Sequence, residues 1–324
     1  MSYDTVGFWI KREDIPGGDT RMILRYLHWK KKEYVEIKGY SYIHFRDYSY
    51  DDYYYWRGTI GNYIVKIYEN GISLEGSLSK YLTDNNFEPT TLEMIRKAVE
   101  KLENDLQINL KIATVTRLDI GFVIRTIYPP HDYYLCFGYK PGFDRWIVLN
   151  SLYYIIKRRK LIVYDKILEA TENGGNIPEK FKEGNYTKIE LGFLEDLKEQ
   201  LGTEVTGATL YDRDFYNKVV KYLYNEFHNI NKVNKMNTIL EGTKTVDEAK
   251  DILFARLLLE AEPNTITEYL IECKTAKIFP NRTDNNRLKK KLYGVIAAPA
   301  AQKSEMVLEL ETAFDKVIKV HTEI

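Results

Sequence analysis

The sequence predicts an α+β fold, with a central antiparallel sheet, flanking helices and a mostly helical C-terminal domain. Several β-rich segments follow one another between residues 34 and 193, and one amphipathic helix, residues 91–106, interrupts them. From about residue 205 onward, apolar residues recur at helical spacing instead. A run of strands followed by a run of helices indicates an α+β protein rather than a doubly wound parallel sheet.

Length and composition set the expected organisation. At 324 residues the chain exceeds a typical single domain, so we expect one domain at residues 1–204 and a second at residues 205–324. The 47 basic and 47 acidic residues balance, which argues against a generic polyelectrolyte binder. The two cysteines lack CxxC spacing and suit a reducing cytosol. With no apolar run of membrane-spanning length and no signal-peptide pattern, we expect a cytoplasmic protein without a membrane partner.

The first strands are marked by β-rich residues and by a turn signal. Residues 34–37 and 63–68 are β-rich, and Asn70-Gly71 predicts a tight hairpin into residues 72–75. Between them, residues 46–58 are polar and aromatic and are expected to form a loop. That loop is either plain surface or a platform for base stacking on Tyr53, Tyr54, Tyr55 or Trp56.

The helix at residues 91–106 is followed by more strands and then by helices. Strands are expected at residues 113–123, 145–150, 152–156, 161–166 and 186–193. The pair flanking residues 157–160 is predicted to form a hairpin, which would place Tyr164 just past its turn. Helices are expected at residues 195–202, 212–230, 247–262, 265–278 and 283–296.

A candidate nucleophile lies in the strand of residues 161–166. Alternate side chains of a strand point to opposite faces, so Ile162, Tyr164 and Lys166 are predicted to share one face. A phenol beside an ammonium group is able to attack a phosphate and neutralise the charge that develops on it. By the same parity Asp165 points away and is a poor candidate for the base.

Two further strands place charged residues on one face in the same way. Parity groups Arg117, Asp119 and Gly121 in one strand, and Lys188, Glu190 and Gly192 in the other. If these strands are neighbours, Asp119 and Glu190 converge near Tyr164, and Glu75 is a possible further contributor. Such hard oxygen ligands suit Mg²⁺ or Mn²⁺, so Asp119, Glu190 and Glu75 are the candidate metal ligands.

Four sequence blocks, in chain order, connect these residues to a known family: GISLEGSLSKYL, TRLDIGF, RRKLIVYDKILE and YTKIELGF. Together they resemble the catalytic region of the phage and plasmid replication-initiation proteins of the filamentous-phage gene II/X family. In outline the chain is also similar to plasmid rolling-circle initiators. The resemblance spans residues 3–193 and thins beyond them. It implies a sheet like that of rolling-circle nickases.

The resemblance also implies an activity, metal-dependent and site-specific nicking of single-stranded DNA. The family's nucleophilic Tyr falls on Tyr164, its Lys on Lys166, and the Glu that closes the block on Glu169. The acidic residues of the second and fourth blocks fall on Asp119 and Glu190. Tyr164 would form a 5′-phosphotyrosine and leave a 3′-OH primer for rolling-circle replication, and a reverse transfer would later rejoin the strand. A phenol of pKa about 10 needs help at neutral pH, which a metal and Lys166 would supply.

Alternatives remain open at this point. Tyr153 and Tyr154 are rival nucleophiles on the paired strand, with cross-strand packing as their other role. Many rolling-circle nickases bind metal through a His-hydrophobic-His pair, and the five histidines form no such pair, so the metal would need carboxylate ligands. A mobilisation relaxase or transposase-like strand transferase would share the nicking step. A non-catalytic DNA-binding replication or copy-control protein would have a purely structural Tyr164.

Basic residues suggest where DNA would bind. Residues 265–278 and 283–296 form two short predicted helices across a tight turn, the second one basic, which is typical either of a helix-turn-helix reader of duplex DNA or of a solvated helical face. The predicted DNA contacts are Arg117, Lys188, Arg158, Arg159, Arg287, Lys289 and Lys290. The expected partners are single-stranded and duplex origin DNA and, by analogy, a host helicase and a second copy of the chain in a bacterial cytoplasm.

Overall fold

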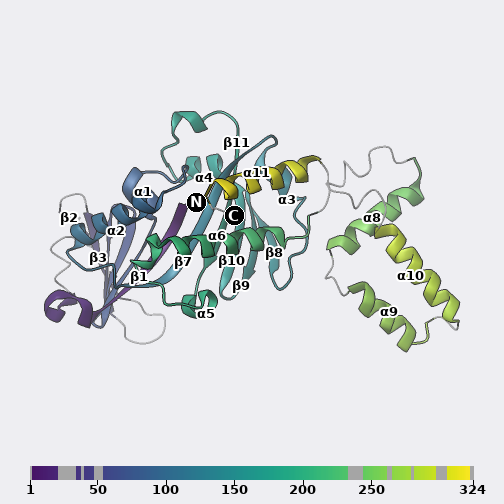
Figure 1. Ribbon diagram of the computed structural model, residues 1–324, viewed down its shortest axis with the longest axis horizontal. Coiled ribbons are helices and arrows are strands. Elements are labelled where there is room, and N and C mark those ends of the chain that lie inside the picture. Colours follow the sequence, from purple (N-terminus) through teal and green to yellow (C-terminus); the bar gives the residue numbers. More distant parts are fainter. Residues whose placement is uncertain are drawn as a thin grey trace.

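A computed structural model of the chain has a single large antiparallel sheet at its centre (Figure 1). The structure describes residues 2–20, 34–37, 40–46, 54–232, 244–260, 265–278, 281–296 and 305–321. The eleven strands lie in the order β2-β3-β4-β5-β6-β1-β7-β11-β10-β9-β8. Their bounds are β1 Ser2–Lys11, β2 Tyr34–Ile37, β3 Tyr40–Arg46, β4 Tyr54–Ile60, β5 Tyr63–Ile67, β6 Gly71–Gly76, β7 Thr114–Thr126, β8 Asp144–Val148, β9 Ser151–Ile156, β10 Arg159–Asp165 and β11 Asn185–Phe193.

The order of the strands confirms both predicted hairpins and meets the condition that the three charged strands are neighbours. β7, β11 and β10 are adjacent, β9 and β10 form the predicted hairpin, and β5 and β6 pair around Asn70-Gly71. The first strand, β1, is inserted between β6 and β7, so the N-terminal residues reach the middle of the sheet.

Helices cover the sheet and make up the end of the chain. Their bounds are α1 Leu78–Thr83, α2 Leu92–Leu106, α3 Pro130–Tyr134, α4 Lys166–Glu172, α5 Leu197–Leu201, α6 Arg213–His228, α8 Val246–Glu260, α9 Thr265–Thr275, α10 Arg282–Ile296 and α11 Glu305–His321. α2 confirms the predicted amphipathic helix: Thr91 caps it by accepting a hydrogen bond from the Met94 amide, and it buries Ile95, Val99 and Leu102. The α+β prediction is therefore confirmed.

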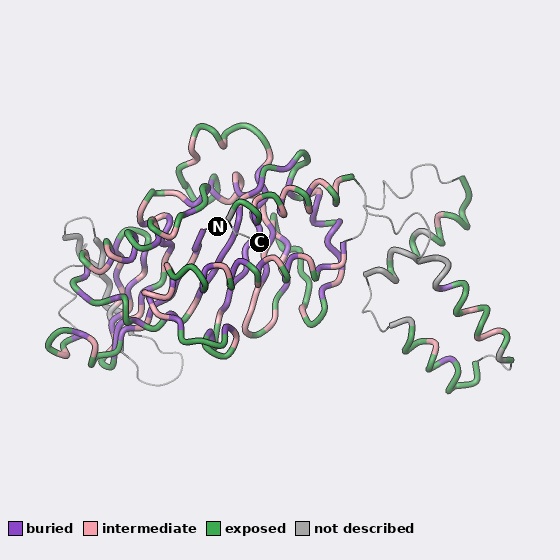
Figure 2. Tube along the Cα trace, viewed as in Figure 1, coloured by how far each residue is buried: buried purple, intermediate pink, exposed green. Residues whose placement is uncertain are grey.

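The hydrophobic core lies between the sheet and the helices that cross one of its faces. Tyr3 of β1 meets Tyr216 of α6 edge-on, and Phe122 of β7 meets Phe314 of α11 in the same way. Figure 2 shows buried residues concentrated along the strands beneath these helices. Since α6 and α11 belong to this core, the core does not end at the boundary expected between residues 204 and 205. The division of the chain into two domains at this boundary stays a prediction.

The helix α10 contacts both α8 and α9, and the described residues of these three helices are mostly exposed (Figures 1 and 2). They lie between α6 and α11 in the sequence, and Figure 1 draws them apart from the sheet. The described part of the chain after residue 205 is thus mostly helical, as expected, although α11 returns to the sheet. Of the described helices, none has the length and apolar character needed to cross a membrane.

Two predicted segments differ from the structure. The loop expected at residues 46–58 is partly strand, because β4 begins at Tyr54. Tyr53 lies outside the described residues, as do the side chains of Tyr54, Tyr55 and Trp56, so the stacking proposal for that segment stays a prediction.

The strand expected at residues 161–166 ends one residue early. Asp165 caps α4 by accepting hydrogen bonds from the Ile167 and Leu168 amides, and Lys166 is the first residue of that helix. The strand parity that grouped Lys166 with Tyr164 therefore does not apply.

Candidate functional site

A polar cluster occupies the sheet face opposite the α6 and α11 layer, over β1, β7, β11 and β10. In the register of these strands Ile162 lies opposite Glu190, and Glu190 lies opposite Gly121. Tyr164 lies opposite Lys188 on one side and Ser151 on the other, so it lies at the far end of the β9–β10 hairpin and not just past its turn. The alternation of polar and apolar residues in β7 and β11 predicted which side chains share this face.

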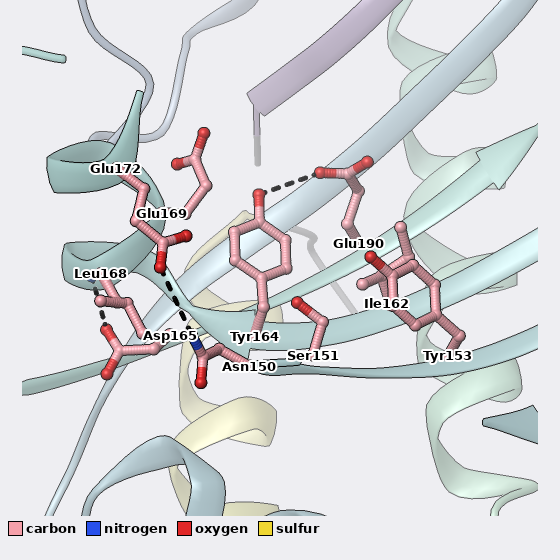
Figure 3. A pocket seen from close by; sticks show the side chains of 10 residues that line it. All are labelled: Asn150, Ser151, Tyr153, Ile162, Tyr164, Asp165, Leu168, Glu169, Glu172 and Glu190. Atoms are coloured by element: carbon pink, nitrogen blue, oxygen red, sulfur yellow. Dashed lines mark hydrogen bonds between the residues drawn. The ribbon is translucent and has the colours of Figure 1, made fainter. Parts of the chain in front are cut away.

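Tyr164 and Glu190 form the central contact of the cluster. The half-buried Tyr164 donates a hydrogen bond from its hydroxyl to Glu190 Oε2 over 3.2 Å (Figure 3). Burial raises the pKa of Tyr164 well above its ordinary value of 10.0, and the negative charge of Glu190 adds to this effect. Burial and the nearby carboxylates of Asp4 and Asp119 raise the pKa of Glu190 to about 7.

Asp119 is held by cations of the protein itself. Its two oxygens accept hydrogen bonds from Arg117 at 3.2 and 2.6 Å, and Lys160 Nζ lies 3.2 Å from Oδ2. The same guanidinium bonds Glu75 at 2.7 Å, so Arg117 lies between the two carboxylates. Asp119 is fully buried, and this network compensates its charge.

Asp4 enters the cluster from β1 and pairs with a buried lysine. Lys188, which is fully buried, donates to Asp4 Oδ1 over 2.5 Å, and Asn86 donates to the same oxygen over 2.7 Å. The other oxygen, Oδ2, is buried and has no hydrogen-bond partner among the residues that the structure describes. Gly121 makes room for it, because a Cβ at that position would lie 3.1 Å from Oδ2 and only 2.8 Å from the Ile189 carbonyl.

Lys166 is buried beside the cluster but does not bond Tyr164. Its ammonium pairs with Glu169 at 2.5 Å and lies 4.9 Å from the centre of the Phe87 ring. Burial, with the nearby Lys188 charge, lowers the pKa of Lys166 to about 8. The Lys166–Glu169 pair lowers the pKa of Glu169 in spite of its burial.

Two cavities open on either side of Tyr164. One, of about 240 Å³, is lined by Asn150, Ser151, Tyr153, Ile162, Tyr164, Asp165, Leu168, Glu169, Glu172 and Glu190 (Figure 3). The other, of about 340 Å³, is lined by Asp4, Thr5, Asn62, Glu75, Gly76, Ser77, Lys80, Asn86, Tyr164, Glu169 and Glu190. Tyr164, Glu169 and Glu190 are shared between them. Of the described residues that line these cavities, Lys80 is the only one with a cationic side chain.

The rival tyrosines have different surroundings. Tyr154 is fully buried on the core face and donates to the Gly138 carbonyl, which is a structural role. Tyr153 is half-buried on the same face as Tyr164 and lines the first cavity. Tyr153 therefore remains a possible nucleophile, and Tyr154 does not reach the site.

The predicted metal ligands do not fit a metal ion in this arrangement. Arg117 already bonds Asp119 and Glu75, and Glu190 accepts from Tyr164. Within the described residues no group of three His, Cys, Asp or Glu is placed to hold a metal. The expectation that Asp119, Glu190 and Glu75 form one ligand set overlooked that a neighbouring arginine would compete for their oxygens.

The predicted DNA contacts near the sheet are mostly engaged elsewhere. Lys188 is buried, so we no longer expect it to contact DNA. Arg158 bonds Asp196 at 3.1 Å and Glu199 at 2.7 Å, and Arg159 bonds Glu226. On α10, Arg287, Lys289 and Lys290 are exposed, and Arg287 lies 3.7 Å from Asp284.

Sequence reasoning missed Asp4, Lys160 and Lys80. The pairing of β1 with β7 is irregular between Tyr3 and Thr5, so strand alternation alone does not assign a face to Asp4. Lys160 shares its face with Ile162 and Tyr164 by simple parity and was available from the sequence. Lys80 lies three residues after Ser77, which caps α1 by accepting a hydrogen bond from the Lys80 amide. This cap is a helix start signal in the sequence, and it places Lys80 in the first turn of α1.

Neither the profile of any known protein family nor any curated protein sequence matches this chain.

Proposed function

We propose that the protein is a tyrosine-dependent, site-specific nickase and strand transferase of single-stranded DNA that initiates rolling-circle replication. The observation that carries the proposal is the Tyr164–Glu190 hydrogen bond at the wall shared by two cavities. A nucleophile bonded to a base whose pKa lies near neutrality is the arrangement that general-base catalysis needs. The four ordered sequence blocks, three of which contribute Glu75, Tyr164 or Glu190, support the same activity.

The chemistry proceeds by transesterification. Tyr164 Oη attacks the scissile phosphorus while its proton passes to Glu190 Oε2. The bond between phosphorus and the 3′-oxygen breaks, and that oxygen takes up a proton from water to become the 3′-OH primer, while Glu190 releases its proton to solvent. The 5′-phosphate stays on Tyr164. In the reverse transfer a 3′-OH attacks the phosphotyrosine, which restores both the strand and the phenol.

Other residues of the site have supporting roles in this proposal. Lys80 lines the second cavity together with Tyr164. Because its ammonium lies 3.9 Å from Glu169, beyond hydrogen-bonding distance, it is able to bind a phosphate in that cavity. Lys160, 3.9 Å from Glu190 Oε1, favours the ionised form of that carboxylate and so opposes the rise of its pKa. Lys166, expected to be catalytic, would act only as a positioning residue through Glu169 and α4.

The requirement for Mg²⁺ or Mn²⁺ stays a prediction without an assigned ligand set. When bound, such an ion would neutralise charge on the phosphate. On the C-terminal helices, Arg287, Lys289 and Lys290 of α10 remain the proposed contacts to duplex origin DNA. A host helicase and a second copy of the chain remain proposed partners, and a bacterial cytoplasm the proposed location.

A non-catalytic DNA-binding replication protein is the second candidate. The observation in its favour is that the buried charges pair with one another: Asp4 with Lys188, Asp119 with Arg117, and Glu169 with Lys166. Such a closed network also serves a purely structural purpose. A relaxase or strand transferase of mobile DNA would share the chemistry above.

Covalent trapping tests the proposal. The protein is incubated with Mg²⁺ or Mn²⁺ and single-stranded DNA of its own replicon, and a denaturant-resistant protein–DNA band is sought. We expect a band that Tyr164→Phe abolishes, that Tyr153→Phe leaves intact, and that chelator removes. Survival of the band in Tyr164→Phe and its loss in Tyr153→Phe would move the nucleophile to Tyr153. Absence of any adduct on every replicon strand would refute the nickase.

A further inference from the structure

An apolar strip leads from the edge of the sheet into the first cavity. The strip consists of Trp146, Tyr153 and Ile162, which lie directly opposite one another on β8, β9 and β10. Directly opposed residues of antiparallel strands point to the same face, so the three side chains line up across the sheet. Glu190 is the next residue in this row, on β11.

The strip is open at its outer end. Trp146 is 58% exposed, which is unusual for the largest apolar side chain, and β8 is an edge strand with every residue exposed. Tyr153 and Ile162 are half-buried and form part of the cavity wall beside Tyr164 (Figure 3). Neighbouring strands lie about 4.8 Å apart, so the strip is about 10 Å long from Trp146 to Ile162.

We infer that this strip is a stacking platform for the unpaired bases of single-stranded DNA beside the scissile phosphate. The inference rests on the proposed function, because it takes Tyr164 as the point of attack. Aromatic side chains on a sheet face stack bases well, since every base offers a flat apolar surface, and such stacking tolerates different sequences. Duplex DNA hides these base faces, so the strip selects single strands.

Charge determines how a strand would lie on the strip. Of the described residues that line the first cavity, Asp165, Glu169, Glu172 and Glu190 are acidic and none is basic. Phosphates are repelled by this wall, whereas neutral bases are not. A bound strand would therefore turn its bases toward Trp146 and Tyr153 and keep the phosphates away from the wall until the scissile one reaches Tyr164 and Lys80.

The test compares two residues of one strand that face opposite ways. Trp146→Ala removes the outer end of the strip, and Ile147→Ala removes a side chain that is 44% exposed on the other face of β8. Both changes are made in the full-length Tyr164→Phe protein, so that binding is measured without cleavage. The probe is a fluorescent oligothymidylate of about 15 nucleotides, near the upper limit of the site size of one single-strand-binding domain. Its binding is measured by fluorescence anisotropy.

We expect Trp146→Ala to weaken binding about 5- to 150-fold, the loss that stacking of one base corresponds to. Ile147→Ala should stay within about twofold of the parent, as is usual for surface changes. Trp146→Phe should restore most of the affinity because it keeps an aromatic face. The dependence on salt should be unchanged, since no phosphate contact is removed. An abasic strand of equal length should bind the parent and Trp146→Ala equally.

Three outcomes would overturn the inference: equal affinities of Trp146→Ala and the parent, equal losses in Trp146→Ala and Ile147→Ala, or a loss that persists on the abasic strand. If Trp146→Ala instead converts a dimer into a monomer in sedimentation while DNA affinity is unchanged, a second copy of the chain covers the strip. Failure of the nickase is seen separately, as absence of the covalent adduct in a protein that still binds the oligonucleotide through Trp146.

Discussion

Replacing Glu190 by Gln tests the electrostatics of the site without any assumption about DNA. Gln has the shape of Glu, and its amide oxygen still accepts the hydrogen bond from the Tyr164 hydroxyl. The change removes the negative charge and replaces one carboxylate oxygen by an NH2 group. It therefore measures what the ionised carboxylate costs in its buried position beside Asp4 and Asp119.

The sign and the size follow from linkage. In the folded protein the pKa of Glu190 is raised from 4.5 to about 7, so between these pH values the folded state holds a proton that the unfolded chain has released. Stability therefore falls as the pH rises through this window. At 1.36 kcal/mol per pH unit the full penalty, reached above pH 7, is about 3 kcal/mol. Because Gln carries no charge, the free energy of unfolding of Glu190→Gln, taken relative to wild type, should rise by about 2 to 3 kcal/mol as the pH is raised from about 5 to about 8.

Urea denaturation at these two pH values, followed by tryptophan fluorescence, measures the difference. We take a urea slope of about 3 kcal/mol per molar. The difference between the urea midpoints of Glu190→Gln and wild type should then be larger at the higher pH, in favour of the variant, by somewhat less than about 1 M. Glu179→Gln is the matched control, because the Glu179 side chain is 86% exposed and its effect should hardly depend on pH. If Glu190→Gln costs the same stability at both pH values, the carboxylate is ionised throughout, and a base with near-neutral pKa is ruled out.

Two further predictions concern the charge network. Lys188→Met should destabilise the fold by about 3 to 5 kcal/mol, because it leaves Asp4 buried without its cation. The control Lys182→Met, at a surface ion pair, should destabilise the fold by less than about 1 kcal/mol. Equal urea midpoints of the two variants would contradict the burial argument. Millimolar Mg²⁺ in the absence of DNA should shift Tm by less than about 1 °C, because carboxylates of the site such as Asp119 are already bonded by the protein's own cations. A larger rise of Tm in wild type that is absent in Glu190→Gln would show that the carboxylates of the site bind the ion.

Much of the fold could be predicted from local patterns. The period-two alternation in residues 186–193, the turn at Asn70-Gly71 and the cap at Thr91 each correspond to elements of the structure at nearly the predicted bounds. The insertion of β1 between β6 and β7 could not be predicted, because pairing partners far apart in sequence are chosen by the packing of the whole sheet. That insertion brings Asp4 to the site. The return of α11 to the sheet was missed for the same reason.

The site shows where strand parity is sufficient and where it fails. Parity placed Asp119, Glu190 and Tyr164 on one face, and adjacent strands bring Glu190 to Tyr164. It failed for Lys166, because Asp165 is a strong N-cap and turns the chain into α4 before the alternation reaches the lysine. Lys166 consequently lies in the helix and bonds Glu169, one turn along, as i,i+3 spacing on a helix allows.

The metal assignment could have been questioned from the sequence itself. Residues two apart on a strand point to the same side, so Arg117 was bound to be the neighbour of Asp119 on the polar face. A planar guanidinium bonds a carboxylate through two parallel hydrogen bonds, and here Arg117 does so with Asp119 while reaching Glu75 on a strand two positions away. An arginine at i−2 from a predicted carboxylate ligand therefore favours an ion pair over a metal site. In contrast, the residue two before Glu190 is Lys188, whose ammonium bonds Asp4 instead, and this leaves Glu190 free to accept from Tyr164.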